Sequence, residues 1–398
     1  MTRWLHIVGI GEEGLNGLLP TARAVVENAE VIVGGERHHD LSASVQAERL
    51  SWPSPFDALI DQLMTLRGRR VVVLATGDPL WYSVGARIGR AVPAGEIQYH
   101  PQLSAFQHLA CRMGWSLADA EALTVHGRPA EQIVPFFAPN ARLLLLTTGS
   151  ETPWQVSKLL NSHGYGASRI TVCAAMGGEN EARFDGTAAD WAHDVPAFNA
   201  MAVECIADEN AAILPLSGLP DDCFETDGTM TKQEVRAITL AKLMPKRGAL
   251  LWDVGAGSGS VGIEWMRSAR DARAIGIEPK PDRRDAAIRN AIALGAPRLQ
   301  MIDGTAPDAL TGLAAPDAVF VGGGLSEEVF ATCWQALKPF GRFVANAVTL
   351  ESETVLRTLY ARHGGQLIRM SVERAAPVGR LTGWRPAMTV TQWSMVKR

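Results

Sequence analysis

Two glycine-rich stretches have the residue types and the spacing of a cofactor-binding turn. The first is VGIGEEGLNGL at 8–18, the second is LLWDVGAGSGSVGIE at 250–264, and each begins in a run of apolar residues. Glycine has no Cβ, so its backbone can turn tightly and lie close to a ligand. A turn of this kind between a strand and a helix is typical of sites for nucleotide-containing cofactors. Both stretches contain GxGxxG, which alone does not distinguish these cofactors.

In the second stretch, acidic residues indicate which of these cofactors fits. Asp253 precedes Gly255, Gly257 and Gly259, and Glu278 ends the next predicted strand. A carboxylate at the mouth of the turn suits the ammonium and sulfonium groups of S-adenosylmethionine and would repel a pyrophosphate. Glu278 is placed to accept hydrogen bonds from a ribose diol. The pattern favours a methyltransferase, with a nicotinamide-dependent dehydrogenase as the alternative.

Two later strand ends add candidates to the same site. Asp303 and Gly304 follow a strand where a polar group could bind adenine, and a plain turn is the other interpretation. Gly322 and Gly323 belong to a run of three glycines after the next strand, which leaves room for a bulky planar ligand. Methyltransferases of exocyclic amines carry an Asn/Asp-Pro-Pro-aromatic stretch here. Its absence argues against methylation of adenine or of glutamine amides.

The first half repeats the form of a cofactor loop with different chemistry. Glu12 and Glu13 occupy the place of a dinucleotide phosphate, where two carboxylates would oppose phosphate binding. A later strand ends in Gly77, Asp78 and Pro79, shortly before Ser83. A further strand is followed by Pro101, and Ser104 and Ala105 begin the next helix.

Short β-branched runs alternate with amphipathic segments along the whole chain. This alternation predicts an α/β fold with parallel sheets covered by helices, and the pattern occurs twice. Turn-forming residues within 207–225 mark a seam. We therefore predict one domain over 1–208 and a second over 209–398. Strands are expected at 4–10, 30–35, 70–77, 96–101, 141–149 and 170–176, and then at 249–257, 273–279, 299–304, 317–324 and 341–350.

Composition excludes several classes of function. The 398 residues carry a formal net charge of −4, without the broad basic stripe of a nucleic-acid binder. The 5 cysteines lack CxxC or Cys/His spacing, so we expect no metal and no disulfides. No apolar run approaches ~18 residues, and the N-terminus enters a strand without a signal-peptide pattern. We expect a cytoplasmic protein that does not bind membranes.

The first half resembles the tetrapyrrole methylases of corrin biosynthesis. The resemblance is carried by the turn at 9–14, by Gly-Asp-Pro at 77–79 with Tyr82 and Ser83, and by Pro-x-x-Ser-Ala at 101–105. The family often has Pro-Gly where this chain has Glu12-Glu13, and similar acidic pairs occur in the branch that methylates C5 of precorrin-6. The second half is similar to the class I methyltransferases that work with that branch, through TKQEVRAITLAKL, DVGAGSGSVGIE, VFVGGG and VANAVTLE.

The resemblance implies a bifunctional enzyme with one S-adenosylmethionine site in each domain and a tetrapyrrole substrate, precorrin-6Y. A tetrapyrrole methylase fold made of two α/β subdomains would methylate C5. A class I Rossmann-like fold would methylate C15 and remove the carboxyl group of the ring C acetate, giving precorrin-8. Because relatives of both halves form oligomers, a homo-oligomer is expected. In the first half the resemblance assigns cofactor binding to Gly9, Gly11, Gly77, Asp78, Pro79, Ser83, Ser104 and Ala105.

The acidic side chains of such a substrate require polar or cationic partners. The alternatives are a solvated turn for 36–39 and, for 231–243, a helix with Thr231 and Glu234 as a capping box. An RNA methyltransferase, or one for another small molecule, is the alternative for the whole chain. The candidate substrate-binding residues are Arg37, His38, His39, His126, Lys232, Arg236 and Asn346.

Overall fold

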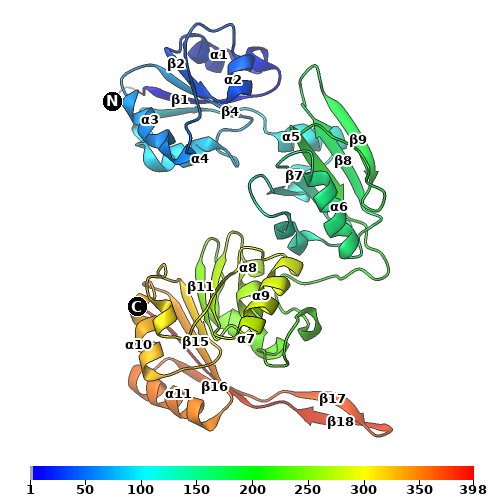
Figure 1. The fold of residues 1–398 in the computed structure, drawn as a ribbon, viewed down its shortest axis with the longest axis vertical. Helices are drawn as coiled ribbons and strands as arrows, with labels where there is room; N and C mark the ends of the chain where they lie inside the picture. The colour runs from blue at the N-terminus through cyan, green and yellow to red at the C-terminus, as the bar shows by residue number, and fades with distance from the viewer. Residues whose placement is uncertain (1–2) are drawn as a thin grey trace. The chain divides into compact units, whose positions relative to one another are not determined.

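The structure is a computed structural model and describes residues 3–398. The chain forms two compact units, one comprising Met1–Ala130 and Phe136–Ala212 and the other comprising Glu131–Pro135 and Ile213–Arg398. Within the described residues, the first unit holds two five-stranded sheets, and the second holds a seven-stranded sheet and a two-stranded hairpin (Figure 1).

The first sheet of the first unit is parallel throughout. Its strands lie in the order β3-β2-β4-β1-β5. They are β1 (Leu5–Ile10), β2 (Val31–Gly34), β3 (Glu48–Ser51), β4 (Val71–Thr76) and β5 (Ile97–His100). The helices connecting them are α1 (Pro20–Glu27), α2 (Glu36–Leu41), α3 (Leu59–Thr65) and α4 (Val84–Ala91).

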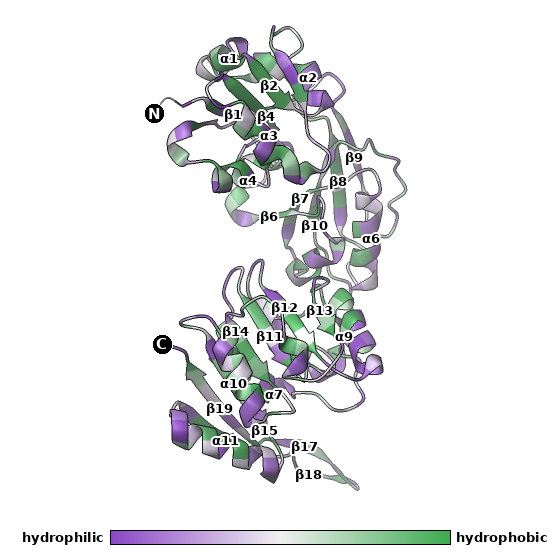
Figure 2. Ribbon diagram, turned by 60° about the vertical axis from the view of Figure 1, so that its left-hand side comes forward, coloured by the Kyte–Doolittle hydropathy of each residue, from purple (hydrophilic) through white to green (hydrophobic). Residues whose placement is uncertain are grey.

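The strands of this sheet are apolar because helices cover both of its faces. On β1, Leu5 and Ile7 pack into the core beneath α3 and α4, whereas Val8 and Ile10 pack into the core beneath α1. Successive side chains of a strand point to opposite faces, so a strand buried on both sides reads as a continuous apolar run. Each fully buried Leu, Ile or Val contributes roughly 1.5–3 kcal/mol. Figure 2 shows these strands as hydrophobic.

The second sheet of the first unit is mixed. Only β6 and β7 are paired in parallel, while β10 runs antiparallel to β7 and β8, and β9 runs antiparallel to β8. The expectation of a parallel sheet is therefore wrong here, because β8, β9 and β10 follow one another without helical crossovers. The elements are β6 (Glu121–Thr124), β7 (Arg142–Leu146), β8 (Arg169–Ala174), β9 (Ala182–Thr187), β10 (Asn199–Glu204), α5 (Ala105–Met113) and α6 (Thr152–Ser162).

The sheet of the second unit has the order β13-β12-β11-β14-β15-β19-β16, and its first five strands are parallel. Its strands are β11 (Leu250–Val254), β12 (Arg273–Ile277), β13 (Gln300–Ile302), β14 (Ala318–Val321), β15 (Arg342–Ala347), β16 (Gln366–Met370) and β19 (Val390–Val396). Its helices are α7 (Gln233–Leu243), α8 (Ser260–Ser268), α9 (Pro281–Ala293), α10 (Glu327–Ala336) and α11 (Leu350–His363).

Two cores again sandwich this sheet. Leu251 of β11 packs beneath α7, α8 and α9, and its neighbours Leu250 and Trp252 pack beneath α10 and α11. The C-terminal part departs from strand-helix alternation, because β19 inserts antiparallel between β15 and β16. Between β16 and β19 the chain forms the hairpin of β17 (Glu373–Val378) and β18 (Leu381–Pro386), which extends away from its own sheet (Figure 1).

Within residues 3–398, no helix combines the length and the apolar character needed to cross a membrane. The same residues hold no group of three or more His, Cys, Asp or Glu side chains placed to bind a metal ion. All five cysteines are free thiols.

Candidate functional site

In the first unit, the turns after β1 and β4 are forced together by their parallel register. Ile10 lies opposite Thr76, so Gly11 and Gly77 leave the sheet at the same edge. A Cβ at Gly9 would lie 2.1 Å from the carbonyl oxygen of Gly77, and Gly77 has a φ of +62°. Both positions therefore require glycine for the close approach of the two turns.

A cavity of about 410 Å³ opens at this edge and continues to the second sheet of the same unit. Its walls come from the turns after β1 and β4, from the start of α5, and from residues of β7, β8 and β10. The predicted residues that line it are Gly11, Arg37, His38, Gly77, Ser83, Ser104, Ala105 and His126. Four predicted residues lie outside the lining, namely Gly9, His39, Asp78 and Pro79.

Asp78 and Ser104 shape the cavity through the backbone. Asp78 Oδ1 accepts hydrogen bonds from the N–H groups of Leu80 (2.7 Å) and Trp81 (3.1 Å), which fixes the turn after Gly77. Ser104 is the N-cap of α5, and its hydroxyl accepts from the N–H of Phe106 at 3.2 Å. Asp78 therefore holds the cavity wall instead of facing the cavity, where the resemblance had placed it.

Arg37 lies in the cavity wall, where its guanidinium already contacts other residues of the protein. Its guanidinium forms an ion pair with Glu12, donates to Thr76 Oγ1 at 2.8 Å, and lies 4.0 Å from the ring centre of Phe198. The side chain of Arg37 is 32% exposed, so it remains accessible to a ligand. Glu12, expected to keep phosphate out of the turn, thus also orients Arg37.

His38 is a neutral residue, which corrects its prediction as a cationic partner. Burial, together with the nearby charges of Arg37 and His39, lowers the pKa of His38 to about 4. Nδ1 accepts from the N–H of Gly35 at 3.1 Å, so Nε2 carries the proton and donates to Thr76 Oγ1 at 2.9 Å. Near pH 7, His38 can position Thr76 but cannot form an ion pair with a carboxylate.

His126 presents one ring nitrogen to the cavity. Its Nδ1 lies 3.1 Å from the carbonyl oxygen of Thr147, to which it must donate. Whenever the imidazole is uncharged, this leaves Nε2 as an acceptor, and His126 lines the cavity. The ring is thus oriented by the protein for a polar contact with a ligand.

In the second unit, the glycine turn is held open above a buried carboxylate. The φ values of Gly255, Gly257 and Gly259 are +72°, +55° and +76°. Residues with a side chain rarely adopt such values. Asp253 Oδ2 accepts from the N–H of Gly262 at 2.9 Å. Within residues 3–398, Asp253 Oδ1 is buried without a hydrogen-bond partner.

The pKa of Asp253 reflects this environment. The pKa of Asp253 is raised to about 7, mainly by burial and also by the charge of Glu278, while the hydrogen bond from Gly262 opposes the shift. An orphaned carboxylate oxygen beneath a turn of three glycines fits a ligand that carries an ammonium group. The residues present thus fit S-adenosylmethionine.

Glu278 is placed at the neighbouring strand end, as predicted from its position. Val254 lies opposite Ile277, so Glu278 follows β12 beside the glycine turn. Glu278 Oε2 accepts from the N–H of Gly257 at 3.0 Å and Oε1 accepts from the N–H of Lys280 at 3.1 Å. A carboxylate has about four acceptor sites, so Glu278 retains capacity for a ribose hydroxyl.

The two later strand ends differ from each other. The side chain of Asp303 is 73% exposed and pairs with Arg284 at 2.8 Å, so its charge is turned to the surface. Gly304 beside it has a φ of +132°. Gly322 and Gly323 are exposed at the end of β14, and a Cβ at Gly255 would lie 3.0 Å from the backbone nitrogen of Gly323.

The comparisons with known proteins follow the same division of the chain. The family described as Tetrapyrrole (Corrin/Porphyrin) Methylases matches residues 4–192, and the family described as Precorrin methyltransferase domain matches residues 222–397. A Sinorhizobium protein named precorrin-6Y C(5,15)-methyltransferase [decarboxylating] is 46% identical over 398 residues, covering 99% of this chain and 96% of its own length. The chain belongs to this family.

One further full-length relative agrees with that assignment, and a solved structure is similar in sequence to the second half of the chain. A Mycobacterium tuberculosis protein of the same name is 37% identical and covers 98% of this chain and 99% of its own. The solved C-terminal domain of the precorrin-6Y C5,15-methyltransferase from Rhodobacter capsulatus is 49% identical, covers 46% of this chain and 98% of that one, and has a TM-score of 0.44.

Arg236, predicted as a substrate-binding residue of the precorrin-6Y methyltransferase, is instead part of the core. It is 0% exposed, and its Nε lies 2.6 Å from Glu264 Oε1. Its other nitrogens donate to Asp221 and to the carbonyl oxygens of Thr231 and Leu219. The prediction is wrong because this face of α7 is turned to the sheet, where the guanidinium ties residues 218–221 to α8.

Two other residues predicted to bind the substrate are Asn346 and Lys232. Asn346 donates to Thr239 at 3.2 Å and accepts from Gln392 at 2.9 Å, so much of its capacity is used within the protein. Lys232 is the N-cap residue of α7, and its own side chain makes no capping hydrogen bond. The N–H of Gln233, the first residue of the helix, donates instead to Asp221 Oδ1 at 2.9 Å. The expected capping box of Thr231 and Glu234 is absent, because Glu234 pairs with Arg374 instead.

Sequence reasoning missed several polar residues that line the first cavity of this family member, among them Thr76, Thr147 and Asn199. The hydroxyl of Thr76 accepts hydrogen bonds from Arg37 and His38. Thr147 donates to the backbone oxygen of Asn199 at 2.7 Å and to its side-chain oxygen at 2.9 Å. Thr76 and Thr147 each follow an apolar run, which was a usable signal. Asn199 lay in a stretch for which no strand was predicted.

Proposed function

We propose that this chain methylates precorrin-6Y at C5 and C15 with S-adenosylmethionine as donor and removes the carboxyl group of the ring C acetate, giving precorrin-8. The observation that carries the proposal is the full-length match to relatives named precorrin-6Y C(5,15)-methyltransferase [decarboxylating]. The two cofactor-type turns support it, since each unit has one turn backed by carboxylates.

We assign C5 methylation to the first unit, and C15 methylation with decarboxylation to the second. The assignment is supported by the descriptions of the two matching families and by the resemblance of the sequence motifs. Gly11, Ser83, Ser104 and Ala105 would border one S-adenosylmethionine site in the cavity of the first unit. Asp253 and Glu278, with the turn of Gly255, Gly257 and Gly259, would hold the other.

Bound S-adenosylmethionine supplies an activated methyl group on a charged leaving group. The meso carbons of a reduced tetrapyrrole are electron-rich nucleophiles, so the protein need only hold the reacting atoms in line and exclude water. The orphaned oxygen of Asp253 would bind the donor's ammonium group, and Glu278 a ribose hydroxyl. In the first unit, Arg37 would contact a substrate carboxylate, and His126 Nε2 would accept a hydrogen bond.

Decarboxylation fits the same substrate without a metal ion. Loss of carbon dioxide leaves an electron pair on the side-chain carbon, and the conjugated macrocycle can accept that pair. A proton then replaces the lost group. The conjugated ring therefore takes the part that a metal ion or an added cofactor plays in other decarboxylations, and we assign neither to this step.

Two matched variants of the full chain test the assignment by mass spectrometry of the product. In Gly11→Val, the added Cβ meets only the flexible carboxylate of Glu13, and in Gly323→Val it meets no atom within 4 Å, so both variants should fold. Gly11→Val is expected to yield a product with one added methyl group that has lost carbon dioxide. Gly323→Val is expected to abolish decarboxylation and C15 methylation.

Equilibrium dialysis with S-adenosylhomocysteine provides the control. The wild-type chain is expected to bind two equivalents and each variant one. Decarboxylation that survives in Gly323→Val but fails in Gly11→Val would reverse the assignment. A wild-type chain that neither methylates nor decarboxylates precorrin-6Y would refute the proposed function.

A further inference from the structure

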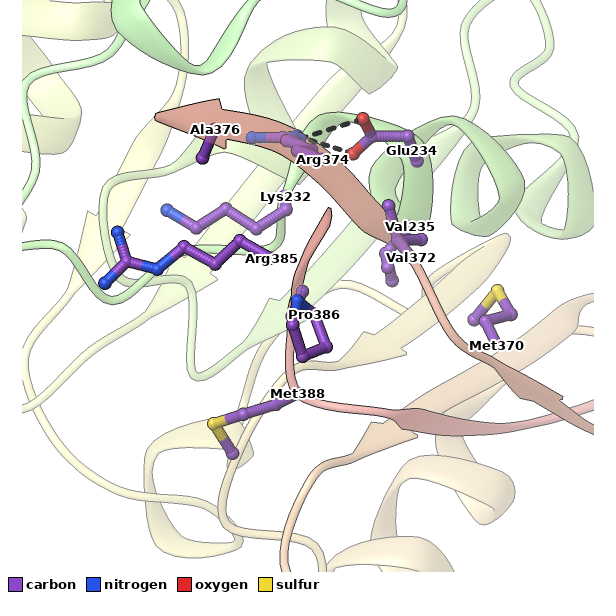
Figure 3. Close-up of a pocket in the computed structure, with 11 residues that line it drawn as sticks. Lys232, Glu234, Val235, Met370, Val372, Arg374, Ala376, Arg385, Pro386 and Met388 are labelled. Carbon is purple, nitrogen blue, oxygen red and sulfur yellow. Dashed lines mark hydrogen bonds and ion pairs between the residues drawn. The ribbon is translucent and has the colours of Figure 1, made fainter. Parts of the chain in front are cut away.

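A second cavity, of about 230 Å³, lies in the second unit between the start of α7 and the β17–β18 hairpin (Figure 3). The hairpin forms one wall, and residues at the N-terminus of α7 form the other. None of the turns assigned above to S-adenosylmethionine contributes to its lining. The cavity is therefore distinct from the site assigned to the methyl donor.

Two of the cations in this cavity lack a protein partner. Arg374 donates to Glu234 from Nε (3.1 Å) and from Nη2 (2.6 Å), and Nη2 also lies 3.2 Å from Asp221. The side chains of Lys232 and Arg385 line the same cavity and make no ion pair with any residue from 3 to 398. Figure 3 shows both side chains running in the same direction from the two walls. With Glu234 neutralised by Arg374, the cavity is cationic.

The remaining lining is apolar. It comprises Val235, Met370, Val372, Ala376, Pro386, Ala387 and Met388. A hydrated inorganic anion gains little from such a surface, whereas a carboxylate attached to an apolar ring system can use both parts of the cavity. A volume of about 230 Å³ admits a side chain of a tetrapyrrole but not the macrocycle, so the ring would lie across the opening.

The segment that leads to Lys232 passes the glycine turn of the second unit. A Cβ at Gly257 would lie 3.6 Å from the carbonyl oxygen of Thr229, and Thr229 precedes Lys232 by three residues. The segment that carries Lys232 therefore begins against the turn assigned to the methyl donor. A substrate anchored by Lys232 would have its ring within reach of that donor.

We propose that Lys232 and Arg385 bind a side-chain carboxylate of the tetrapyrrole, and that this carboxylate is one the reaction retains. The proposal rests on the proposed function and assigns the substrate anchor of the second unit. Two cations on opposite walls match the two oxygens of a carboxylate.

The anchored carboxylate cannot be the one that leaves as carbon dioxide. In decarboxylation the negative charge moves from the carboxylate into the ring. A cation bound to that carboxylate would stabilise the ground state more than the transition state, and so would slow the step. Lys232 and Arg385 are thus positioning residues for both reactions of the unit, and removing them should affect methylation and decarboxylation equally.

The test compares Lys232→Met, Arg385→Met and the double variant with Lys232→Arg and Arg385→Lys. Arg380→Met is the matched control, because Arg380 is an exposed arginine of the same hairpin outside the cavity. Each Met variant is expected to raise KM for precorrin-6Y about tenfold or more, with kcat within about twofold. The conservative variants and the control should retain the wild-type KM, and the ratio of methylated to decarboxylated product should not change.

Binding of a porphyrin octacarboxylate, followed by fluorescence quenching, tests the anchor without turnover. The double variant is expected to bind it about tenfold more weakly than the Arg380→Met control. Unchanged binding would overturn the anchor even if precorrin-6Y is the substrate. Weaker binding in a protein that does not turn over precorrin-6Y would support the carboxylate site and refute the proposed function. A change in decarboxylation without an equal change in methylation in the Met variants would overturn the assignment of the anchor to a retained carboxylate.

Discussion

Arg37 and Arg236 lie in two regions of opposite character, although both were expected to meet the substrate. Arg37 lines a cavity, pairs with Glu12 and packs on Phe198, and its side chain is still 32% exposed. Arg236 is fully buried, and Glu264, Asp221 and two backbone carbonyl groups occupy its donors. The difference teaches that an arginine serves a ligand only where the fold leaves some of its hydrogen-bonding capacity unused.

His38 and Asp253 extend the comparison to pH. Burial lowers the pKa of His38 in the first unit and raises the pKa of Asp253 in the second, because burial disfavours the charged form in both cases. The neutral form of His38 is its base, whereas the neutral form of Asp253 is its acid. The two units are therefore expected to respond to pH in opposite directions.

The largest expected difference between the two regions is in the free energy of unfolding that each loses when its arginine side chain is removed. Arg236→Met is expected to lower the free energy of unfolding of the second unit by about 3–5 kcal/mol, since Glu264 would keep a buried charge without its cation. Arg37→Met should lower that of the first unit by about 1 kcal/mol or less. Urea denaturation of both variants measures this, and equal losses would contradict the comparison.

The pH response of Asp253 should be the next largest effect. Its folded pKa of about 7 lies above its unfolded value, so the folded state holds the proton more tightly. The stability of the second unit should therefore fall as pH rises from about 4 to about 7, by on the order of 3 kcal/mol. Urea denaturation at pH 5, 6 and 7 should show this slope in the wild type and its loss in Asp253→Asn. The same slope in both proteins would assign it to other groups.

His38 should give a smaller slope of opposite sign in the first unit. Its folded pKa of about 4 lies below the unfolded value, so the unfolded state binds protons more readily. The stability of the first unit should fall as pH drops from about 6.5 towards 4, by about 2 kcal/mol at pH 5. Thermal unfolding of the wild type and of His38→Gln between pH 5 and 7 tests this, with a slope expected only in the wild type.

The smallest effect is expected at His126. His126→Ala should change stability by less than about 0.5 kcal/mol, because the residue is exposed. Loss of one neutral hydrogen bond to the substrate should raise KM about two- to tenfold. His193→Ala is the matched control, since His193 lies outside the cavity and contacts the backbone of Asp185. A normal KM in His126→Ala would exclude a substrate contact.

The strands with the clearest sequence pattern are buried on two faces. The strands expected at 4–10, 70–77 and 249–257 appear as β1, β4 and β11, because their apolar runs lie between two helical layers. Two of the strands that sequence reasoning missed, β10 and β19, are largely buried but run antiparallel to their neighbours, outside the strand-helix alternation. Others are short or exposed. β3 has no fully buried residue, and β17 and β18 form an exposed hairpin. Such strands are held by pairing, which a local pattern does not display.

In the candidate sites, the glycine positions could be predicted from the sequence more easily than the roles of the polar side chains. Glycines forced by close backbone approach, such as Gly9 and Gly77, were visible because only glycine fits those positions. The side-chain roles were less visible. Asp78 and Asp303 have the residue type of a ligand contact, yet one holds a turn and the other forms a surface ion pair. Arg385 gave no signal, because its partner in the cavity, Lys232, lies 153 residues earlier in the chain.

The amino-acid sequence alone determined where the backbone must turn tightly, which runs must be buried, and therefore that two α/β units each carry a glycine turn at a strand end. These properties follow from local sterics and from the burial of apolar side chains. Only the tertiary structure decided which charged groups remain free. That depends on partners far apart in the chain, as Arg236 with Glu264 and Arg374 with Glu234 show, and on the desolvation that sets the charge of His38 and Asp253.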